Sequence, residues 1–394
     1  MRGLISILLF LLLSGSLHAS TQSEDSTEVF FLTCTPGKEV VTIYGHSAIR
    51  IVKASIGLDQ VYGWGNYDFS APYFVWKFAT GRLKYTIADE TYERFLKEYF
   101  LENRTVYSQK INLTNAQKET LVDLININMR PDNRLVLYDF FYDNCSTRVR
   151  DIIEIVVGDK LVFPDENIDD QYTFREKINK AQGPIPWLTF GTDMLIGTTG
   201  DKKAGFRDQM FLPEDLMKNL SLMKIKDSTG MIPLLQKPVT VFDFKSTSNK
   251  VILTPFIVFS ILLIIIMLSS FLLKREKIIE YIDKFLFLSF SILSILMVFF
   301  NFFTDHQAMK MNFNILWLNP FLIIAFITLF TKNKNPIWFR IVFLTSSGFL
   351  LSFAILPQSI NLACIPLILI LILRSFSRSK FRFASFLKTD LIIS

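Results

Sequence analysis

Residues 143–158 read DNCSTRVRDIIEIVVG, and this pattern predicts a helix with one buried face. Four apolar residues follow the i, i+3, i+4, i+7 spacing that such a helix requires: Val149, Ile152, Ile153 and Val156. Gly158 is suited to end the helix, and either Asp143 or Asn144 is suited to cap its N-terminus. Cys145 would then lie in the first helical turn.

Upstream of this helix the sequence alternates strand and helix signals, which makes the domain α+β. Apolar–polar alternation and Gly/Pro turns predict strands at 28–34, 38–44, 47–53, 59–65, 83–88, 104–111 and 135–141. A helix is expected from about Thr91 to Glu102, and the capping-box spacing of Thr114 and Gln117 predicts another that runs to about Met129. Between 159 and 250 the pattern is looser. There, residues 211–223 indicate an amphipathic helix near the membrane.

The two ends of the chain carry membrane signals. Residues 1–20, MRGLISILLFLLLSGSLHAS, have the layout of a secretory signal peptide, 1–19, cleaved after Ala19; an uncleaved anchor is the alternative. Residues 20–250 would then form an extracytoplasmic domain. From 251 to 394 five apolar stretches predict an all-α, five-helix transmembrane bundle: 251–273, 285–303, 313–330, 337–356 and 359–373.

The basic residues around these stretches predict the orientation of the bundle. With the N-terminal domain outside, the cytoplasmic segments hold Lys274, Arg275, Lys277, Lys284, Lys332, Lys334, Arg340, Arg374, Arg378, Lys380, Arg382 and Lys388. The outer loops hold only Lys310. This asymmetry follows the positive-inside rule and places the C-terminus in the cytoplasm, which an odd number of spans requires.

The composition supports a soluble domain joined to a membrane domain. Half of the 394 residues are hydrophobic, 20% are charged and the mean hydropathy is +0.34. A disordered chain is excluded by the apolar content, and a disulfide scaffold by a total of 3 cysteines. Because the basic residues of the cytoplasmic segments explain most of the net charge of +6, nucleic acid is not an expected partner.

Cys145 and His46 are the candidate chemical groups of the outer domain. A thiol at a helix N-terminus gains thiolate character from the helix dipole, and Arg148 and Arg150 add positive charge within one turn. His46, in YGHSAIRI at 44–51, is placed at the start of a strand and would be the base that a nucleophilic thiol needs. Two other interpretations stay open: a structural disulfide between Cys34 and Cys145, and His46 as a hydrogen-bonded turn residue. Neither metal-ligand spacing nor a nucleotide-binding loop is present, so no cofactor is expected.

The order of a His strand followed by an Asn-Cys helix start resembles the circularly permuted papain-like fold of the lecithin:retinol acyltransferase type. More specific segments resemble the Lnb family of bacterial lipoprotein N-acyltransferases. They are LTCTPG at 32–37, YGHSAIRI at 44–51, VYGWGNYDF at 61–69, NRTVYSQKINLT at 103–114, YDFFYDNCSTRVRDII at 138–153, WLTFGTDMLIG at 187–197 and FLP at 211–213. The resemblance covers nearly all of the chain after the signal peptide.

The resemblance implies a membrane-bound enzyme of the bacterial inner membrane whose catalytic domain faces the periplasm. It would move a fatty acyl group from a phospholipid donor, through a Cys145 thioester, to the terminal amine of a diacylated lipoprotein, with His46 as base. The third catalytic member would be Asp68, with Asn66 nearby, because the family pattern has Asn where this chain has Gly63. A turn-capping role is the alternative for Asp68.

The same chemistry needs groups that stabilise an oxyanion and support the thiol. The backbone N–H of Cys145 is the simplest oxyanion donor, with Tyr44 and Asn144 as neighbouring candidates. Asp143 and Arg148 are expected to support the site. Aromatic residues at 73–76 and 140–142 would line an acyl groove, lie at the membrane interface or simply form core, and His306 would either contact a headgroup or be solvated.

Two other functions fit the same sequence. One is a membrane-tethered thiol peptidase or amidase acting on cell-wall peptides. The other is a non-enzymatic sensor or binding module that contains the Cys34–Cys145 disulfide. Titration of the thiols separates the sensor from the two enzymes, and the sequence does not indicate an oligomeric state.

Overall fold

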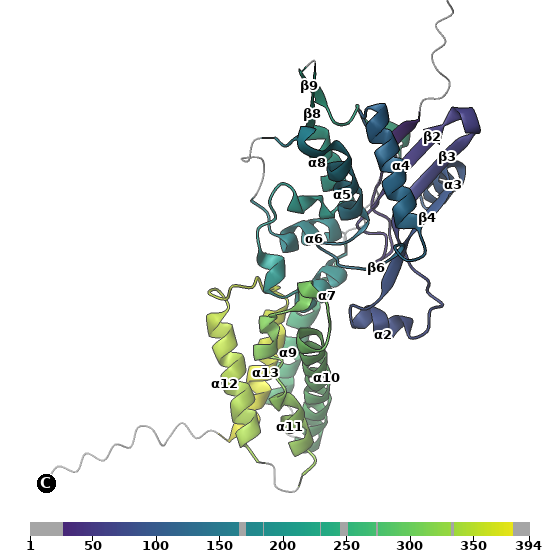
Figure 1. Cartoon of the computed structure of the whole chain (residues 1–394). Coiled ribbons are helices and arrows are strands. Elements are labelled where there is room, and N and C mark those ends of the chain that lie inside the picture. Colours follow the sequence, from purple (N-terminus) through teal and green to yellow (C-terminus); the bar gives the residue numbers. More distant parts are fainter. Residues whose placement is uncertain are drawn as a thin grey trace, which may run out of the picture.

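The chain folds into an α+β N-terminal domain followed by a bundle of helices (Figure 1). In this computed structural model the described residues are 27–164, 171–183, 185–228, 230–244, 251–272, 275–331 and 335–380. The expected signal peptide, 1–19, and the basic residues beyond 380 lie outside these ranges. In Figure 1 the N-terminal domain occupies the upper part of the picture and the bundle the lower part.

A seven-stranded antiparallel sheet forms the centre of the N-terminal domain. Its strand order is β10-β5-β1-β2-β3-β4-β6. The strands are β1 (Glu28–Cys34), β2 (His46–Lys53), β3 (Leu58–Asn66), β4 (Lys84–Thr91), β5 (Val106–Lys110), β6 (Leu135–Leu137) and β10 (Val239–Phe242). A smaller sheet contains β7 (Leu161–Val162), β8 (Lys224–Asp227) and β9 (Gly230–Pro233).

The two faces of the large sheet are covered by different helices, because neighbouring strand residues point to opposite faces. On one face Ile49 and Ile51 join a core with α4 (Asn115–Met129), α5 (Cys145–Val157) and α8 (Pro213–Leu222). On the other face Ala48 and Val61 pack against α3 (Tyr92–Leu101). The α5 helix predicted from residues 143–158 is therefore confirmed, and its apolar stripe faces the sheet.

The structure corrects three predictions about the N-terminal domain, one of them entirely and two of them in part. Residues 38–44 form consecutive turns instead of a strand, since Gly37 N–H bonds Thr42 O and β1 pairs directly with β2. The strand predicted at 135–141 ends at Leu137, because the following residues turn around Asp139, which accepts two backbone N–H groups. The amphipathic helix at 211–223 is α8, whose apolar side packs into the domain core instead of lying near the bundle.

The bundle contains α9 (Pro255–Leu272), α10 (Glu276–Phe302), α11 (Phe321–Thr328), α12 (Ile337–Ser352) and α13 (Cys364–Ser379). Only α9 and α10, among the described residues, are both long and apolar enough to cross a bilayer unaided. The third predicted span is divided into a short turn of helix, Phe313–Leu316, and α11, with Pro320 between them. The last predicted span is shifted, since its helix begins at Cys364 and continues past Arg374.

Arg374 therefore lies within the bundle rather than in a free cytoplasmic segment. Arg374 and Arg378 on α13 both donate to the buried carboxylate of Asp283 on α10, and Arg374 also bonds Ser270 on α9. Charged side chains inside a transmembrane bundle need such partners, because lipid offers them neither hydrogen bonds nor opposite charges. The cluster fastens three helices together at one end of the bundle.

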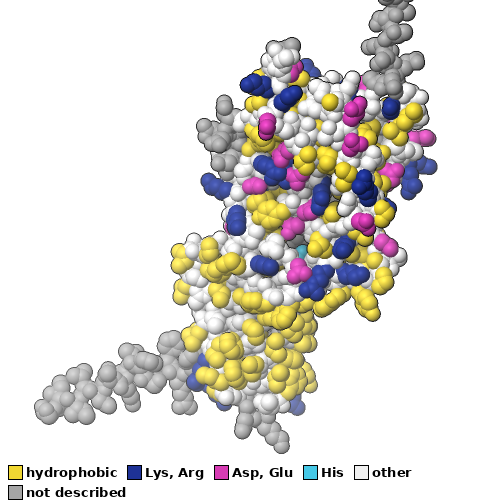
Figure 2. All heavy atoms as spheres, in the orientation of Figure 1, with side chains coloured by type: hydrophobic (Ala, Val, Ile, Leu, Met, Phe, Trp, Pro, Cys, Tyr) yellow, Lys and Arg dark blue, Asp and Glu magenta, His cyan; other side chains and the backbone are white. Residues whose placement is uncertain are grey.

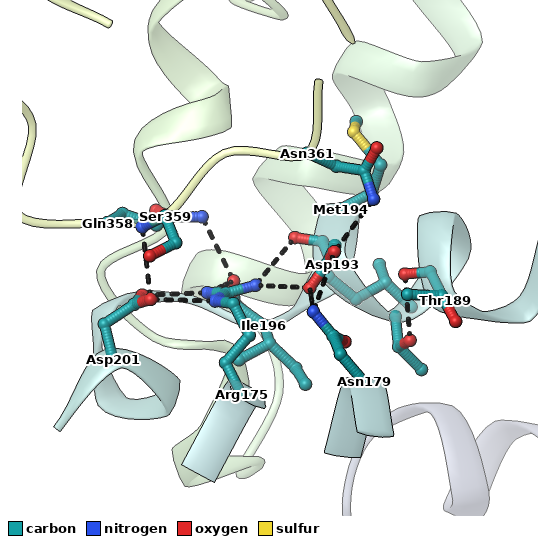
Figure 3. Close-up of polar contacts among 12 residues, drawn as sticks. Arg175, Asn179, Thr189, Asp193, Met194, Ile196, Asp201, Gln358, Ser359 and Asn361 are labelled. Carbon is teal, nitrogen blue, oxygen red and sulfur yellow. Dashed lines mark hydrogen bonds and ion pairs between the residues drawn. The ribbon is translucent and has the colours of Figure 1, made fainter. Parts of the chain in front are cut away.

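The short helices α6 (Phe174–Gln182) and α7 (Pro186–Leu195) lie where the N-terminal domain meets the bundle, and Figure 3 draws the polar contacts made there. Arg175 on α6 is buried and donates to Asp193 and Asp201, and also to the carbonyl oxygens of Ile196 and Gly197. The loop between α12 and α13 binds the same two carboxylates. Asn361 donates to Asp193 and the Ser359 N–H donates to Asp201. The junction is thus a buried polar network that both parts share.

Candidate active site

Cys145 is the first residue of α5, and Asn144 holds the helix start in place. The Asn144 Oδ1 accepts the N–H groups of Ser146 and Thr147 at 2.9 and 3.0 Å. Its Nδ2 donates to the carbonyl oxygens of Phe140 and Phe211 at 2.9 and 3.0 Å. Both amide hydrogens are therefore used, so in this geometry Asn144 positions the thiol and has no donor left for an oxyanion.

The Cys145 thiol is partly buried, and its environment is less activating than a helix N-terminus alone suggests. Burial raises the pKa of Cys145, while hydrogen bonds from the Ser47 backbone N–H and from Ser146 oppose that rise. The helix-dipole argument therefore predicted the wrong direction, because desolvation outweighs it here. At neutral pH the resting thiol is protonated, and a base must accept its proton before it can attack.

His46 directly precedes Ser47, whose backbone N–H bonds the Cys145 thiol, but the imidazole of His46 faces the other side of the sheet. Its strand partner is Cys34, and the alternation of β2 places it on the α3 face with Ala48, whereas α5 packs on the face of Ser47. No hydrogen bond joins His46 and Cys145 among the described residues. The structure thus brings the two residues to one end of β2 without bringing their side chains together.

The imidazole of His46 lines a polar cavity of about 330 Å³ with Glu98 and Arg104. Burial, aided by the nearby Arg104 charge, lowers the pKa of His46 to about 4. A β-carbon at Gly63 would lie 3.1 Å from the His46 Nε2, so the ring occupies space that a larger residue would need. The ring is consequently neutral at physiological pH.

Asp68 and Asn66 do not bind His46 in this structure. Asp68 is fully exposed and accepts hydrogen bonds from the backbone N–H and hydroxyl of Ser70, which lower its pKa. This is the turn-capping role. Asn66, at the end of β3, is exposed and contributes to the wall of the His46 cavity. Asn66, unlike Asp68, lines the same cavity as His46, and this is where a third catalytic residue would have to lie in order to orient the imidazole.

Asp143 and Arg148 support the thiol from the other side of the helix start. Arg148 makes a two-pronged ion pair with the Asp143 carboxylate, and this raises the pKa of Arg148. The Tyr85 hydroxyl donates to the Asp143 carbonyl oxygen at 2.6 Å, which ties the loop before α5 to β4. These contacts hold Cys145 in position but leave its thiol unpaired with a charge.

Tyr85 and Tyr138 lie near the Cys145 thiol, and Tyr138 lies near Tyr44, the tyrosine proposed from the sequence as an oxyanion donor. The Tyr44 hydroxyl accepts a hydrogen bond from Gln182, so its own proton stays available for an oxyanion, and burial raises its pKa to about 12. Burial also raises the pKa of Tyr138, with contributions from Cys145, Tyr44 and Tyr67. Ser47, Tyr67 and Tyr138 lie in the segments that resemble the Lnb family, but only folding brings these segments together.

All three cysteines of the described chain are free: Cys34, Cys145 and Cys364. Cys34 is buried on the α3 face beside Tyr99, and burial raises its pKa far above the usual range. The structural disulfide between Cys34 and Cys145 is therefore not formed. Among the described residues no group of three His, Cys, Asp or Glu side chains is arranged to hold a metal ion.

We expect Asn144→Ala to destabilise the fold by about 2 kcal/mol and to displace Cys145. The change removes the α5 cap and leaves two carbonyl oxygens without donors. Thermal unfolding and the rate of Cys145 alkylation measure the two effects. Thr114→Ala, which removes the equivalent cap of α4, should lower stability and leave the alkylation rate unchanged. Equal alkylation rates in the Asn144 variant and the wild type would contradict a positioning role.

Comparison with family models identifies both parts of the chain. Residues 17–175 match the Lnb N-terminal periplasmic domain, and residues 246–384 match the Lnb transmembrane domain, which is described as a five-helix domain. Together these matches span well over half of the sequence. Comparison with curated proteins found no match, and neither did comparison with solved structures.

Proposed function

The chain belongs to the Lnb family, and from this we propose that it is a lipoprotein N-acyltransferase of the bacterial inner membrane. The observation that carries the proposal is a free thiol, Cys145, held at a capped helix start in a periplasmic domain that is joined to a transmembrane domain. Both substrates of such an enzyme are lipids that remain in the bilayer, and an anchored thiol meets them without extracting them. We place the C-terminus in the cytoplasm. The order of the His46 strand and the Cys145 helix agrees with a permuted papain-like arrangement.

The reaction proceeds in two acyl transfers. Cys145 sulfur attacks an ester carbonyl carbon of a phospholipid, and the ester C–O bond breaks, which leaves an acyl thioester and a lysophospholipid. The thiol proton passes to the base and then to the departing alkoxide. The α-amine of a diacylglyceryl-cysteine then attacks the thioester, forms the amide and restores the thiol after losing its proton to the base.

The oxyanion of each tetrahedral intermediate needs donors near Cys145. We assign this role to the Cys145 backbone N–H and the Tyr44 hydroxyl, whose proton is not committed elsewhere in the described contacts. Asn144, Asp143 and Arg148 act by holding the helix start. Asn66 is the remaining candidate to orient the imidazole, since Asp68 is occupied by Ser70.

His46 is the proposed base, and this assignment requires its ring to turn from the α3 face toward the strand end where Cys145 lies. No other histidine lies in the described part of the periplasmic domain, residues 27–164, 171–183, 185–228 and 230–244. His46→Gln is expected to slow thioester formation roughly 100-fold or more. A wild-type rate of thioester formation in this variant would show that another group is the base, and the proposal of Cys145 as the nucleophile would stand.

The pH dependence of thioester formation tests the environment of His46. Because the pKa of the resting, buried ring is about 4, the free enzyme holds a neutral imidazole, able to accept a proton once it turns toward Cys145, from neutral pH down to about pH 5. We therefore expect a rate that is level over this range and falls toward pH 4, whereas a solvated imidazole would lose activity near pH 6.5. The rate of acyl-enzyme formation between pH 4 and pH 8 measures this. A midpoint near 6.5 would contradict the buried setting.

The thiol-peptidase alternative receives less support. The domain carries exposed apolar and aromatic side chains on the segment nearest the bundle, including Val75, Trp76 and Phe78. Exposed surfaces of this kind suit a lipid interface better than a water-soluble peptide. Acyl loading from phospholipid in the absence of peptide cleavage would distinguish the two enzymes.

A further inference from the structure

The segment 67–82 exposes more large apolar side chains than a water-facing loop normally does. It contains α2 (Phe74–Ala79). Five of its side chains are mostly exposed: Phe69, Tyr73, Val75, Trp76 and Phe78. The aromatic rings form a connected row, with centroid distances of 4.9 Å for Tyr67–Phe69, 5.2 Å for Phe69–Phe74 and 6.5 Å for Phe74–Phe78. An uncovered aromatic row of this length marks an interaction surface.

The position of α2 identifies what covers this surface. Trp76 packs on Phe299, in the last turn of α10, with a centroid distance of 5.6 Å. In Figure 1 α2 lies at the lower edge of the N-terminal domain, beside the upper end of α10. That end of α10 is the periplasmic one, because it is the end that contacts the N-terminal domain, which matches a periplasmic domain. The exposed row is thus continuous with the lipid-facing surface of the bundle.

Three polar contacts hold α2 and the residues after it against the loop that follows α10. Arg82 Nε donates to Asp305 at 2.7 Å, and the Asp305 N–H donates to Thr80 O at 2.8 Å. The His306 Nε2 lies 2.9 Å from Phe78 O. Gly81 has a positive φ of 73°, and a β-carbon there would lie 2.9 Å from the His306 nitrogen, so the close approach requires glycine. His306 therefore serves as a tether for α2.

Charge and apolar surface are arranged as a membrane interface demands. Figure 2 shows hydrophobic side chains over the bundle and along the lower edge of the N-terminal domain, with basic and acidic side chains gathered directly above that edge. Aromatic residues below and charged residues above are the pattern at the headgroup level of a bilayer. A water-soluble partner protein would not need the aromatic row to continue onto the transmembrane surface.

The other end of the aromatic row reaches the core that contains the thiol. Tyr67 and Cys145 pack against the same cluster of buried residues. Tyr67 contacts Phe69 and Phe74, so ring contacts run from the thiol side of the domain to Phe78 on α2, the helix whose Trp76 packs on the bundle. A hydrocarbon chain lying along these rings would stay out of water between the bilayer and Cys145.

We propose that residues 67–82 lie in the outer leaflet of the membrane and that their aromatic row guides a phospholipid acyl chain to Cys145. The membrane contact stands on the geometry of this segment alone. The guiding role rests on the proposed acyltransferase function, and it identifies the region that takes up the donor lipid.

The membrane contact is tested with a fluorescent probe in the full-length protein. Val75→Cys carries the environment-sensitive dye NBD in a Cys145→Ala background, and Ile155→Cys on α5 is the matched control; these positions are 76% and 62% exposed. The protein is reconstituted in phosphatidylethanolamine–phosphatidylglycerol vesicles with brominated acyl chains. Quenching at position 75 should exceed that at position 155 by roughly threefold or more, because the segment would sit 5–10 Å deep. Equal quenching would overturn the membrane contact.

The guiding role is tested with Cys145 intact. Val75→Asp should reduce acyl loading of Cys145 from vesicle phospholipid roughly tenfold, because a charge opposes insertion at the interface. Loading from a monomeric short-chain phospholipid should be unchanged, and Ile155→Asp should change neither. Unchanged loading from vesicles, or equal loss with both donors, would overturn the guiding role. Absence of loading in the wild type would instead contradict the proposed function, and the quenching experiment would still decide the membrane contact.

Discussion

Cys145→Ala is expected to abolish lipoprotein N-acylation and to remove the acyl-enzyme. Wild-type protein incubated with phospholipid should gain the mass of a fatty acyl group on the peptide that contains Cys145, and hydroxylamine should remove it, because thioesters are cleaved under conditions that leave oxygen esters intact. The variant should show neither the adduct nor the transfer. Peptide mass spectrometry and the mobility of a lipoprotein acceptor are the measurements.

Two cysteine controls make this experiment specific. Cys34→Ala and Cys364→Ala remove thiols that are buried away from the site, so adduct formation at Cys145 should persist in both. Cys145→Ser keeps the side-chain volume and the α5 cap, and a slow oxygen ester that resists hydroxylamine would mark the same position. Undiminished acylation by Cys145→Ala, or an adduct on Cys34, would exclude Cys145 as the nucleophile.

Arg175→Met is expected to have the largest effect on stability, about 3–5 kcal/mol. Arg175 is buried and its guanidinium pairs with two buried carboxylates, those of Asp193 and Asp201. Methionine preserves the apolar stem and removes the charge, which leaves both carboxylates without their main partner. Because Asn361 and Ser359 bind the same carboxylates, the junction with the bundle should loosen as well. The unfolding midpoint in detergent and protease sensitivity near residue 359 measure these effects.

A charge-balanced variant separates two effects of Arg175→Met on stability: the buried carboxylates left without a partner, and the altered packing of the side chain. Adding Asp193→Asn and Asp201→Asn to Arg175→Met removes the buried negative charges and should recover part of the lost stability. Arg94→Met, at a side chain that is 81% exposed, should change stability by less than about 0.5 kcal/mol. An Arg175 variant as stable as Arg94→Met would show that the network contributes little.

Local sequence patterns predicted most of the elements around the site. The stripe in residues 143–158, the N-cap at Asn144 and the capping box at Thr114 all lie within one or two helical turns, so neighbouring residues suffice to specify them. The strand at 47–53 was predictable for the same reason. The apolar stretches after residue 250 indicated a membrane domain, although the breaks at Pro320 and before Cys364 shortened or shifted three of the expected spans.

The face on which His46 lies was decided only by tertiary structure. A strand alternates its side chains, so a shift of one residue moves each to the opposite face, and the register with β1 places His46 opposite Cys34. The acidity of Cys145 likewise depends on burial beneath residues far away in sequence, and this burial outweighs the local helix dipole.

The amino-acid sequence by itself determined the family, the two-part organisation and the placement of Cys145 at a helix start, because these depend on motifs and on short-range periodicity. The tertiary structure alone decided that Arg175 links the periplasmic domain to the bundle and that α2 lies against α10. Contacts of this kind join residues more than 150 positions apart. The packing of whole helices and strands decides which residues meet in such contacts, and the sequence pattern around each residue carries no information about that packing.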